Sequence, residues 1–328
     1  MYDYGLSVLE QYGLTATGSS RIRGALLCRT EQGPVVVREF RGSEKKLKMQ
    51  QELLVTIREN GYRADSFLEN GEGELISRDS DNIPYTLQHW YEGRECDTKS
   101  EDDIVRGAGL LAEIHKVMKL APDGFYMQPD LKEVCRRHNQ ELRKIRRFIR
   151  KKGASCDFEK DYLSSVEWFL RKGEEALTLL EDTGYERLMQ DVLEQGWVCH
   201  GEYNQHNILF AGREMAATGF DHWSFGIQMS DLYQFMRKIL EKHGWDSRLA
   251  EKMLDAYSAK RPVSSDEVDY LKIRFLYPDK YWKLANYYYS HNKAWISEKN
   301  TEKMKTLIRQ KERWDRFGRT FFPGGNDV

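Results

Sequence analysis

The stretch from Trp197 to Tyr233 constrains this chain more than any other, because it alternates short apolar segments with tight polar turns. Residues 197–199 have the composition of a strand end, and residues 208–210 have that of the next strand. The polar loop between them, residues 200–207, therefore lies at the mouth of a hairpin. An acidic turn around Asp221 comes after a third short strand. This order places a carboxylate and an amide of the loop only a few residues apart.

The residue types in this stretch are those that phosphoryl transfer requires. A carboxylate, here Glu202, accepts the proton of the attacking hydroxyl, and an amide oxygen, here of Asn207, binds magnesium. A second carboxylate from the next turn, here Asp221, would complete the magnesium site. After Ser230 the pattern predicts a helix that opens with Asp231. Either of these last two side chains can cap that helix.

The sequence HGEYNQHNIL resembles the HGDxxxxN loop of the aminoglycoside phosphotransferase group within the protein-kinase-like fold. Within that group, the chain is most similar to spore coat proteins of the CotS type. Four stretches carry the resemblance across residues 87–295: LQHWYEGREC, LLAEIH, HGEYNQHNIL with FDHWSFGIQMSDLYQFMRKIL, and FLYPDKYWKLANYYYSHNKAW. Their occurrence together and in this order is specific, whereas any one of them alone would be a weak signal.

The resemblance implies an α+β fold of the bilobal protein-kinase-like type. Residues 1–92 would form an N-lobe built on an antiparallel sheet, and residues 93–328 a mostly helical C-lobe with the catalytic-type loop 200–207. It also implies catalytic roles for His200 and Asn207 beside Glu202, and a bracing role for Asp231 behind the loop. If the site is active, ATP and magnesium are its cofactors, and Asn207 and Asp221 hold the metal.

Three positions depart from the family pattern. Glu202 stands where the family has a catalytic aspartate, and its extra methylene displaces the carboxylate by about 1 Å, which can cost on the order of 10²-fold in rate. Arg38 replaces the lysine that pairs with the nucleotide phosphates, and its planar fork differs from a point charge. Counted back from Asp231 without gaps, the family's magnesium aspartate falls on Gly219. With a local shift it falls on Asp221.

Three N-terminal features leave alternatives open. Arg38 either contacts a nucleotide phosphate or pairs with an acidic neighbour. Glu52, on a helix predicted over residues 45–58, either pairs with Arg38 in the nucleotide site or faces solvent. The segment GSSRIRG, residues 18–24, either covers the nucleotide or is a plain hairpin turn.

Phosphoryl transfer depends almost entirely on positioning and electrostatics, so three departures together predict a degenerate site. With the resemblance, this favours a spore coat-associated pseudokinase that serves as a structural or interaction component. The alternative is an active ATP-dependent phosphotransferase that acts on a hydroxyl of a small molecule or of a coat protein. The sequence leaves open the substrate, the oligomeric state and whether ATP or magnesium binds.

Composition narrows the class of protein further. The 328 residues are enough for two lobes with cores, and 51 basic against 52 acidic residues give a formal net charge of −1, which favours neither nucleic acid nor a membrane surface. The five cysteines form no CxxC pair, so neither a zinc site nor a disulfide framework is indicated. No signal peptide or membrane helix is expected. We therefore expect a cytoplasmic protein or a spore coat component, with other coat proteins as partners.

Residues 131–152 predict a helix in which nearly every charged residue from 136 to 152 is basic. This segment either binds an anionic ligand or forms a solvated face that pairs with acids such as Glu101, Asp102 and Asp103. It contains no recognition module and no interleaved aromatic residues, so nucleic acid is not an expected partner.

The rest of the chain gives simpler patterns. His115 recurs at helix spacing with apolar residues, and we expect a core histidine held by hydrogen bonds. The aromatic residues from 275 to 295 are expected to form core and no ligand site. The other predicted elements are a short helix over 3–12, strands over 26–28, 35–37, 73–77 and 84–90, and helices from 102, over 162–180 and within 266–317.

Overall fold

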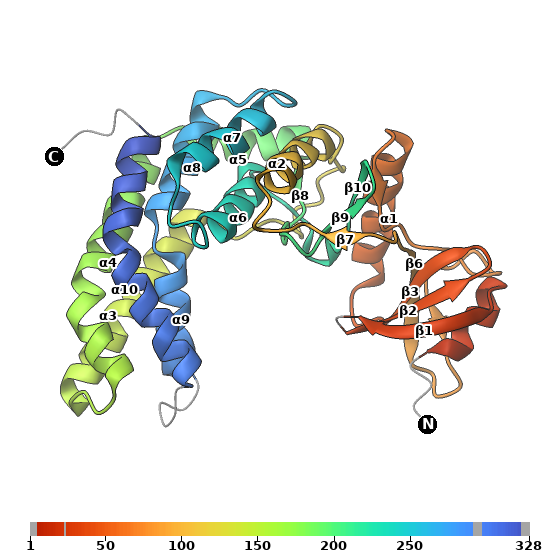
Figure 1. Ribbon diagram of the computed structural model, residues 1–328, viewed down its shortest axis with the longest axis horizontal. Helices are drawn as coiled ribbons and strands as arrows, with labels where there is room; N and C mark the ends of the chain where they lie inside the picture. The colour runs from red at the N-terminus through yellow and green to blue at the C-terminus, as the bar shows by residue number, and fades with distance from the viewer. Residues whose placement is uncertain (1–4, 23, 291–296, 323–328) are drawn as a thin grey trace.

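The computed structural model describes residues 5–22, 24–290 and 297–322. The chain forms an elongated arch, with an antiparallel sheet and one long helix at one end and a bundle of long helices at the other (Figure 1). Short strands and further helices connect the two ends. The last part of the fourth family-like stretch, residues 291–295, lies outside the described residues.

The N-terminal end is a five-stranded antiparallel sheet in the order β1-β2-β3-β6-β5. Its strands are β1 (Ala16–Ile22), β2 (Ala25–Thr30), β3 (Gly33–Glu39), β5 (Ser77–Arg78) and β6 (Pro84–His89). Alternate side chains, among them Cys28, Val35 and Val37, form a core together with the 3-10 helix η1 (Leu6–Tyr12). The strands predicted over 26–28 and 35–37 are confirmed.

Two N-terminal predictions need comment. Residues 18–22 of GSSRIRG belong to β1, which pairs with β2, and residue 23 lies outside the described residues. The strand predicted over 73–77 is wrong, because a turn in which Gly73 has a φ of 80° leaves only the two residues of β5.

A long helix, α1 (Glu44–Glu59), follows the first three strands. Its first turn is capped by Ser43, whose hydroxyl accepts a hydrogen bond from the Lys46 amide at 3.4 Å. Leu47, Leu54 and Ile57 are buried on one face. The helix predicted over 45–58 is therefore confirmed.

A second sheet joins distant parts of the chain in the order β4-β10-β9-β7. Its strands are β4 (Arg63–Ala64), β7 (Arg94–Glu95), β9 (Ile208–Ala211) and β10 (Glu214–Ala217). The hairpin β9–β10 is the one that the central stretch predicts. Strand β4 runs parallel to β10 and places Ala64 opposite Ala217. The chain after β4 therefore lies beside the chain after β10, and a short pair, β8 (Val198–Cys199) with β11 (Ser224–Phe225), flanks the central loop.

The helices in the middle of the molecule share its largest core. They are α2 (Glu101–His115), α5 (Tyr185–Gln195), α6 (Met229–Leu240), α7 (Ser247–Ser258) and α8 (Ser265–Leu276). His115 is fully buried, with Nδ1 2.8 Å from the Tyr257 hydroxyl and Nε2 3.2 Å from Oδ2 of Asp231. The prediction of a hydrogen-bonded core histidine is confirmed.

The far end of the arch is formed by α3 (Leu131–Lys152), α4 (Asp157–Asp182), α9 (Asp279–Ser290) and α10 (Glu298–Phe321) (Figure 1). Aromatic rings fill the space between these helices. The Tyr281 ring stacks on Phe169 at 3.9 Å and on Tyr162 at 5.6 Å between centroids. This packing confirms the core role expected for most aromatic residues of this segment, although Tyr287 is exposed.

One row of basic residues on α3 pairs with glutamates of α4. These ion pairs are Arg136–Glu181 at 2.6 Å, Arg150–Glu167 at 3.6 Å, Arg143–Glu174 and Arg146–Glu167. The solvated, ion-paired alternative therefore holds for this row. Its partners, however, are not Glu101, Asp102 and Asp103, which pair with Lys252, Arg106 and Arg94 instead.

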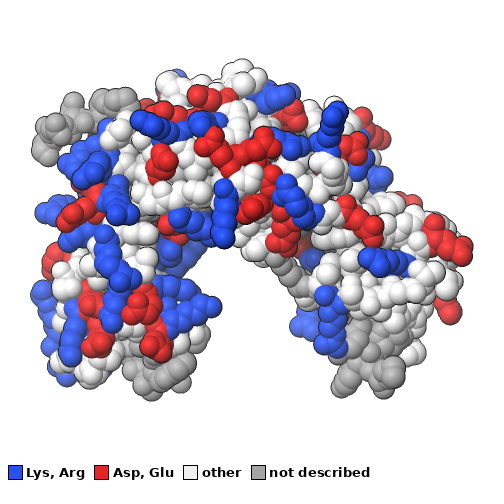
Figure 2. Space-filling model, in the orientation of Figure 1, with Lys and Arg blue, Asp and Glu red and all other residues white. Residues whose placement is uncertain are grey.

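A second row on α3, which we call the outer row, consists of Arg137, Lys144, Arg147 and Lys151. All four are exposed, and none has an ion pair within the described part of the chain. Elsewhere, acidic and basic side chains are mixed over the visible face of the molecule (Figure 2). In the ranges that the structure describes, no helix is long and apolar enough to cross a membrane.

Candidate functional site

The central loop, residues 200–207, connects β8 to β9 and starts with a fully buried histidine. Nε2 of His200 donates to the Thr218 carbonyl at 3.0 Å, and its Nδ1 accepts from the Glu202 amide at 3.2 Å. These two bonds fix one neutral tautomer. Burial lowers the pKa of His200, which keeps the ring neutral at pH 7. The geometry makes His200 an anchor of the loop.

Asp231 holds the loop from behind. Its buried carboxylate accepts hydrogen bonds from the amides of His200 at 2.6 Å and Gly201 at 2.9 Å, and from His115 Nε2 at 3.2 Å. Helix α6 begins at Met229, so the expectation that it opens with Asp231 is wrong by two residues. Neither Ser230 nor Asp231 caps the helix, because both lie within its first turn and Gln228 occupies the cap position.

Gly201 allows the loop to pass close to the acidic turn. Its φ is 82°, a left-handed conformation that favours glycine, and a Cβ at this position would lie 2.0 Å from the His222 carbonyl oxygen. The acidic turn is the 3-10 helix η2 (Phe220–His222). Any larger residue at 201 would therefore push these two segments apart.

Asn204 and Asn207 both donate to the backbone carbonyl of Glu202. The Glu202 carbonyl accepts from Nδ2 of Asn204 at 2.8 Å and of Asn207 at 3.0 Å. The Glu202 side chain itself is 49% exposed, and its carboxylate lies 3.4 Å from Nε2 of His222. The Glu202 carboxylate is thus half-exposed, and the Asn207 side chain is held by its amide nitrogen.

Gly219 lies directly against Asn207. A Cβ on Gly219 would be 3.0 Å from Cγ, Oδ1 and Nδ2 of Asn207. The Gly219 amide donates to Oδ2 of Asp65 at 2.8 Å. The position next to the loop amide, where a second metal ligand would be expected, therefore carries no side chain.

Asp221 faces the N-terminal sheet. It forms an ion pair with Arg38 of β3, and its carbonyl lies 3.5 Å from Nζ of Lys46 on α1. Arg38 thus pairs with an acidic neighbour. This is one of the two roles that the sequence left open for Arg38, the other being contact with a nucleotide phosphate. The pair between Arg38 and Glu52 does not form in the described structure: Glu52 is exposed on α1, as its solvent-facing alternative predicts.

Two residues beside this site were missed by sequence reasoning. Asp65 is 2% exposed, and burial raises its pKa to about 8; its Oδ1 has no hydrogen-bond partner among the described residues. Burial lowers the pKa of Lys46, whose Nζ lies 5.3 Å from the Trp223 ring centroid. An aspartate in a short polar segment and a lysine on a helix give no sequence signal, because their neighbours are distant in the chain.

The donor set does not fit a magnesium ion held as in an active phosphotransferase. Of the two expected ligands, Asp221 is engaged by Arg38, and only Asn207 lies at the loop. Magnesium prefers near-octahedral oxygen coordination that includes carboxylates, which Gly219 does not supply.

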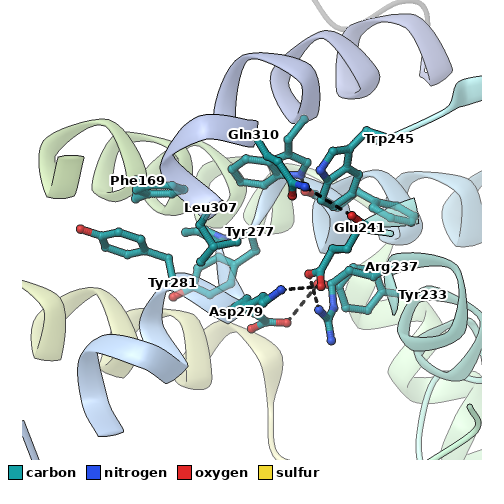
Figure 3. A pocket seen from close by; sticks show the side chains of 14 residues that line it. Phe169, Tyr233, Arg237, Glu241, Trp245, Tyr277, Asp279, Tyr281, Leu307 and Gln310 are labelled. Carbon is teal, nitrogen blue, oxygen red and sulfur yellow. Dashed lines mark hydrogen bonds and ion pairs between the residues drawn. The ribbon is translucent and has the colours of Figure 1, made fainter. Parts of the chain in front are cut away.

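Two cavities lie outside this site. A small one of about 40 Å³ lies among α4, α6, α9 and α10, with aromatic walls and the ion-paired Arg237 and Glu241 at its edge (Figure 3). A larger open groove of about 340 Å³ lies between α10 and the turn before α7, lined by Arg313 and Arg316 among others. Neither contains a residue of the central loop.

The chain is similar in sequence to spore coat proteins. Residues 6–321 match the profile of the family described as "Spore coat putative kinase YutH". Spore coat protein S of Bacillus subtilis (strain 168) is 25% identical over 162 residues, which is 49% of this chain and 46% of that protein. The alignment therefore spans less than half of this curated relative.

Solved structures of phosphotransferases share the fold. An aminoglycoside phosphotransferase from Alicyclobacillus acidocaldarius subsp. acidocaldarius DSM 446 superposes with a TM-score of 0.87, at 17% identity over 96% of this chain and 94% of that chain. A spectinomycin phosphotransferase solved with ADP and spectinomycin has a TM-score of 0.57, at 12% identity over 96% of each chain. At these identities the likeness shows the fold alone, and it confirms the α+β kinase-like class.

Proposed function

This chain belongs to the YutH family of kinase-like spore coat proteins, and from that membership we propose that it is a structural or interaction component of the coat with a degenerate phosphotransfer site. Other coat proteins are its proposed partners, and the coat is its proposed location. The proposed lobes are residues 1–92 and 93–328.

One observation carries this proposal: glycine occupies the position that faces Asn207. A Cβ added to Gly219 would lie 3.0 Å from the Asn207 amide, which supports the ungapped register, in which the family's magnesium aspartate falls on this glycine. A carboxylate there would lie beside the Asn207 amide, and two oxygen ligands of one cation lie side by side in this way. Without this carboxylate the site has one magnesium ligand fewer. Little would then balance the negative charge of a bound triphosphate.

The other two departures from the family pattern, Arg38 and Glu202, also weaken the site. Arg38 is engaged by Asp221, so the cation that would hold phosphates and the remaining metal carboxylate neutralise each other. Glu202 keeps a negative charge near the base position but has one methylene too many, and the carboxylate lies beside His222. Each departure alone is tolerable, but together they remove most of the electrostatic positioning on which phosphoryl transfer depends.

The charges that Arg38, Glu202 and Asp221 keep at the site favour one alternative function. This alternative is an active ATP-dependent phosphotransferase that acts on a hydroxyl of a small molecule or of a coat protein. In that case Glu202 is the base, with His200 and Asn207 as its neighbours in the loop. Asn207 and Asp221 hold magnesium, and Arg38 contacts the phosphates after nucleotide has displaced its ion pair. The half-exposed Glu202 carboxylate is the observation that keeps this alternative open.

A phosphoryl transfer assay separates the two functions. With ATP, magnesium and a panel of hydroxyl acceptors, we expect the protein and its Glu202→Gln variant to give the same background signal. The matched control is the triple variant Arg38→Lys/Glu202→Asp/Gly219→Asp, which restores the family residues. Transfer by the unmodified protein at the roughly 1–100 s⁻¹ typical of kinases, abolished in Glu202→Gln, would establish the active alternative.

A further inference from the structure

The outer row of α3 repeats the spacing of the row that pairs with α4. The arginines of that inner row lie seven, three and four residues apart, at Arg136, Arg143, Arg146 and Arg150. Each residue of the outer row directly follows one of these arginines, so the outer row has the same spacing. In an α-helix, intervals of three, four and seven residues keep side chains on one face. Helix α3 therefore presents two rows of cations, one toward α4 and one toward solvent.

Helix α4 shows what a row of this spacing can bind. Its glutamates that meet the inner row lie seven residues apart, at Glu167, Glu174 and Glu181. The two helices are antiparallel, because Arg136 near the start of α3 pairs with Glu181 near the end of α4. Each row extends over roughly four turns, or about 21 Å along its helix axis. A second helix with glutamates at these intervals would match the outer row in the same way.

The outer row has no partner of its own within the described ranges. Its four side chains are exposed, and none forms an ion pair or a hydrogen bond with another described residue. The neighbouring glutamates of α3 are engaged elsewhere: Glu133 binds Arg136 at 2.6 Å, and Glu141 accepts from Nε1 of Trp282 at 2.6 Å. Glu141 is the only acidic residue from 134 to 152 in the sequence. It keeps its charge, but the four cations of the outer row outweigh it.

This excess of positive charge is local. The whole chain has a formal net charge of −1, and acidic and basic side chains are mixed over the visible face of the molecule (Figure 2). An acidic partner would therefore be drawn to the outer row and not to the protein as a whole. Helix α3 belongs to the bundle at the end of the arch opposite the N-terminal sheet (Figure 1). A partner bound there would leave the central loop free.

From this spacing we propose that the outer row binds a helix of a partner protein that carries glutamates seven residues apart on one face and lies antiparallel to α3. The proposal rests on the interaction role proposed above, to which it gives a surface and a partner chemistry, and it involves no phosphoryl transfer. An acidic helix is favoured over nucleic acid, because α3 already binds such a helix through its inner row. Exposed ion pairs are individually weak and screened by salt, so this binding should be strongly salt-dependent.

The test is binding of a labelled, alanine-rich helical peptide, followed by fluorescence anisotropy at low and high salt. Its four glutamates have the intervals of the outer row in reverse order, as an antiparallel helix requires. We expect binding at low salt that weakens roughly tenfold in Lys144→Glu/Arg147→Glu and is lost at high salt. A peptide of the same composition, with its glutamates spread around the helix, should bind severalfold more weakly.

The matched control is Lys48→Glu/Lys99→Glu. These two lysines are also exposed, on α1 and before α2, and neither side chain has an ion pair in the described part of the chain. The double variant makes the same change in net charge and should bind the peptide like the unmodified protein. Lys144→Gln/Arg147→Gln removes the charges without reversing them, so it should give an intermediate loss and serves if charge reversal impairs folding.

Four results with the peptides would overturn the proposal: no binding at low salt, equal binding by the outer-row variant, an equal loss in the control, or equal binding of the peptide with scattered glutamates. Tighter binding of duplex DNA through the same residues would also overturn it, because the partner would then be nucleic acid. None of these measurements uses ATP. Phosphoryl transfer by the protein would refute the degenerate site and leave peptide binding unchanged, so the two failures are distinguishable.

Discussion

Replacement of Asp231 by alanine is expected to lower the free energy of unfolding by about 3–5 kcal/mol. The side chain is fully buried, and its carboxylate accepts from the His200 and Gly201 amides and from His115. Removal leaves these donors without partners in a dry interior, and each such donor costs about 1–3 kcal/mol. Thermal unfolding should show a decrease in Tm of roughly 5–10 °C for a chain of this size.

Asp231→Asn is the matched control. It keeps the shape and one acceptor oxygen but loses the charge, so its loss of stability should lie between those of the alanine variant and the unmodified protein. A Tm for Asp231→Ala within about 1 °C of the unmodified protein would show that Asp231 does not hold the loop.

Glu159 on α4 should contribute about 2–3 kcal/mol of stability that depends on pH. Its carboxylate is fully buried and binds Nζ of Lys152 at 2.5 Å, the Ser155 amide at 2.6 Å and the Tyr288 hydroxyl. Burial alone would raise the pKa of Glu159, but the hydrogen bonds from Lys152, Tyr288 and Ser155 outweigh it and lower the pKa to about 2.

Because the folded-state pKa lies below the ordinary value of 4.5, the stabilisation is fully present above pH 4.5 and is lost as the pH falls toward 2. We therefore expect Glu159→Gln to be less stable than the unmodified protein at pH 7 in urea unfolding. The difference should shrink progressively between pH 4.5 and pH 2. A difference independent of pH across this range would contradict the assignment. Glu167→Gln on the exposed face of the same helix should change stability by less than about 1 kcal/mol.

Local sequence patterns predicted much of this fold. The bounds of α3 and the hairpin β9–β10 after the central loop follow from apolar periodicity and turn residues, which act over a few positions. His115 was also predicted correctly, because a histidine on an apolar helix face has few roles other than a hydrogen-bonded core residue. The resemblance of four ordered stretches to a family supplied the kinase-like class, which periodicity alone would not give.

The errors arose where the partner of a side chain is distant in the sequence. Glu52 was a candidate partner of Arg38, but the acidic turn supplies Asp221 instead. Asp231 was expected to brace the central loop, and its carboxylate does accept from the loop amides, but α6 begins two residues before it. Asp65 and Lys46 were overlooked for the same reason. Their importance comes from chain segments that only the tertiary fold brings together.

The measurement that most directly tests the degenerate site is thermal unfolding with and without ATP and magnesium. A ligand at 100 times its dissociation constant stabilises by about 2.7 kcal/mol, which is a shift of several degrees. We expect no magnesium-dependent rise in Tm for the unmodified protein at millimolar ATP, and a rise in Gly219→Asp, where a carboxylate again faces Asn207. A magnesium-dependent rise in the unmodified protein would contradict the account, because the site would then hold metal and nucleotide without the missing aspartate.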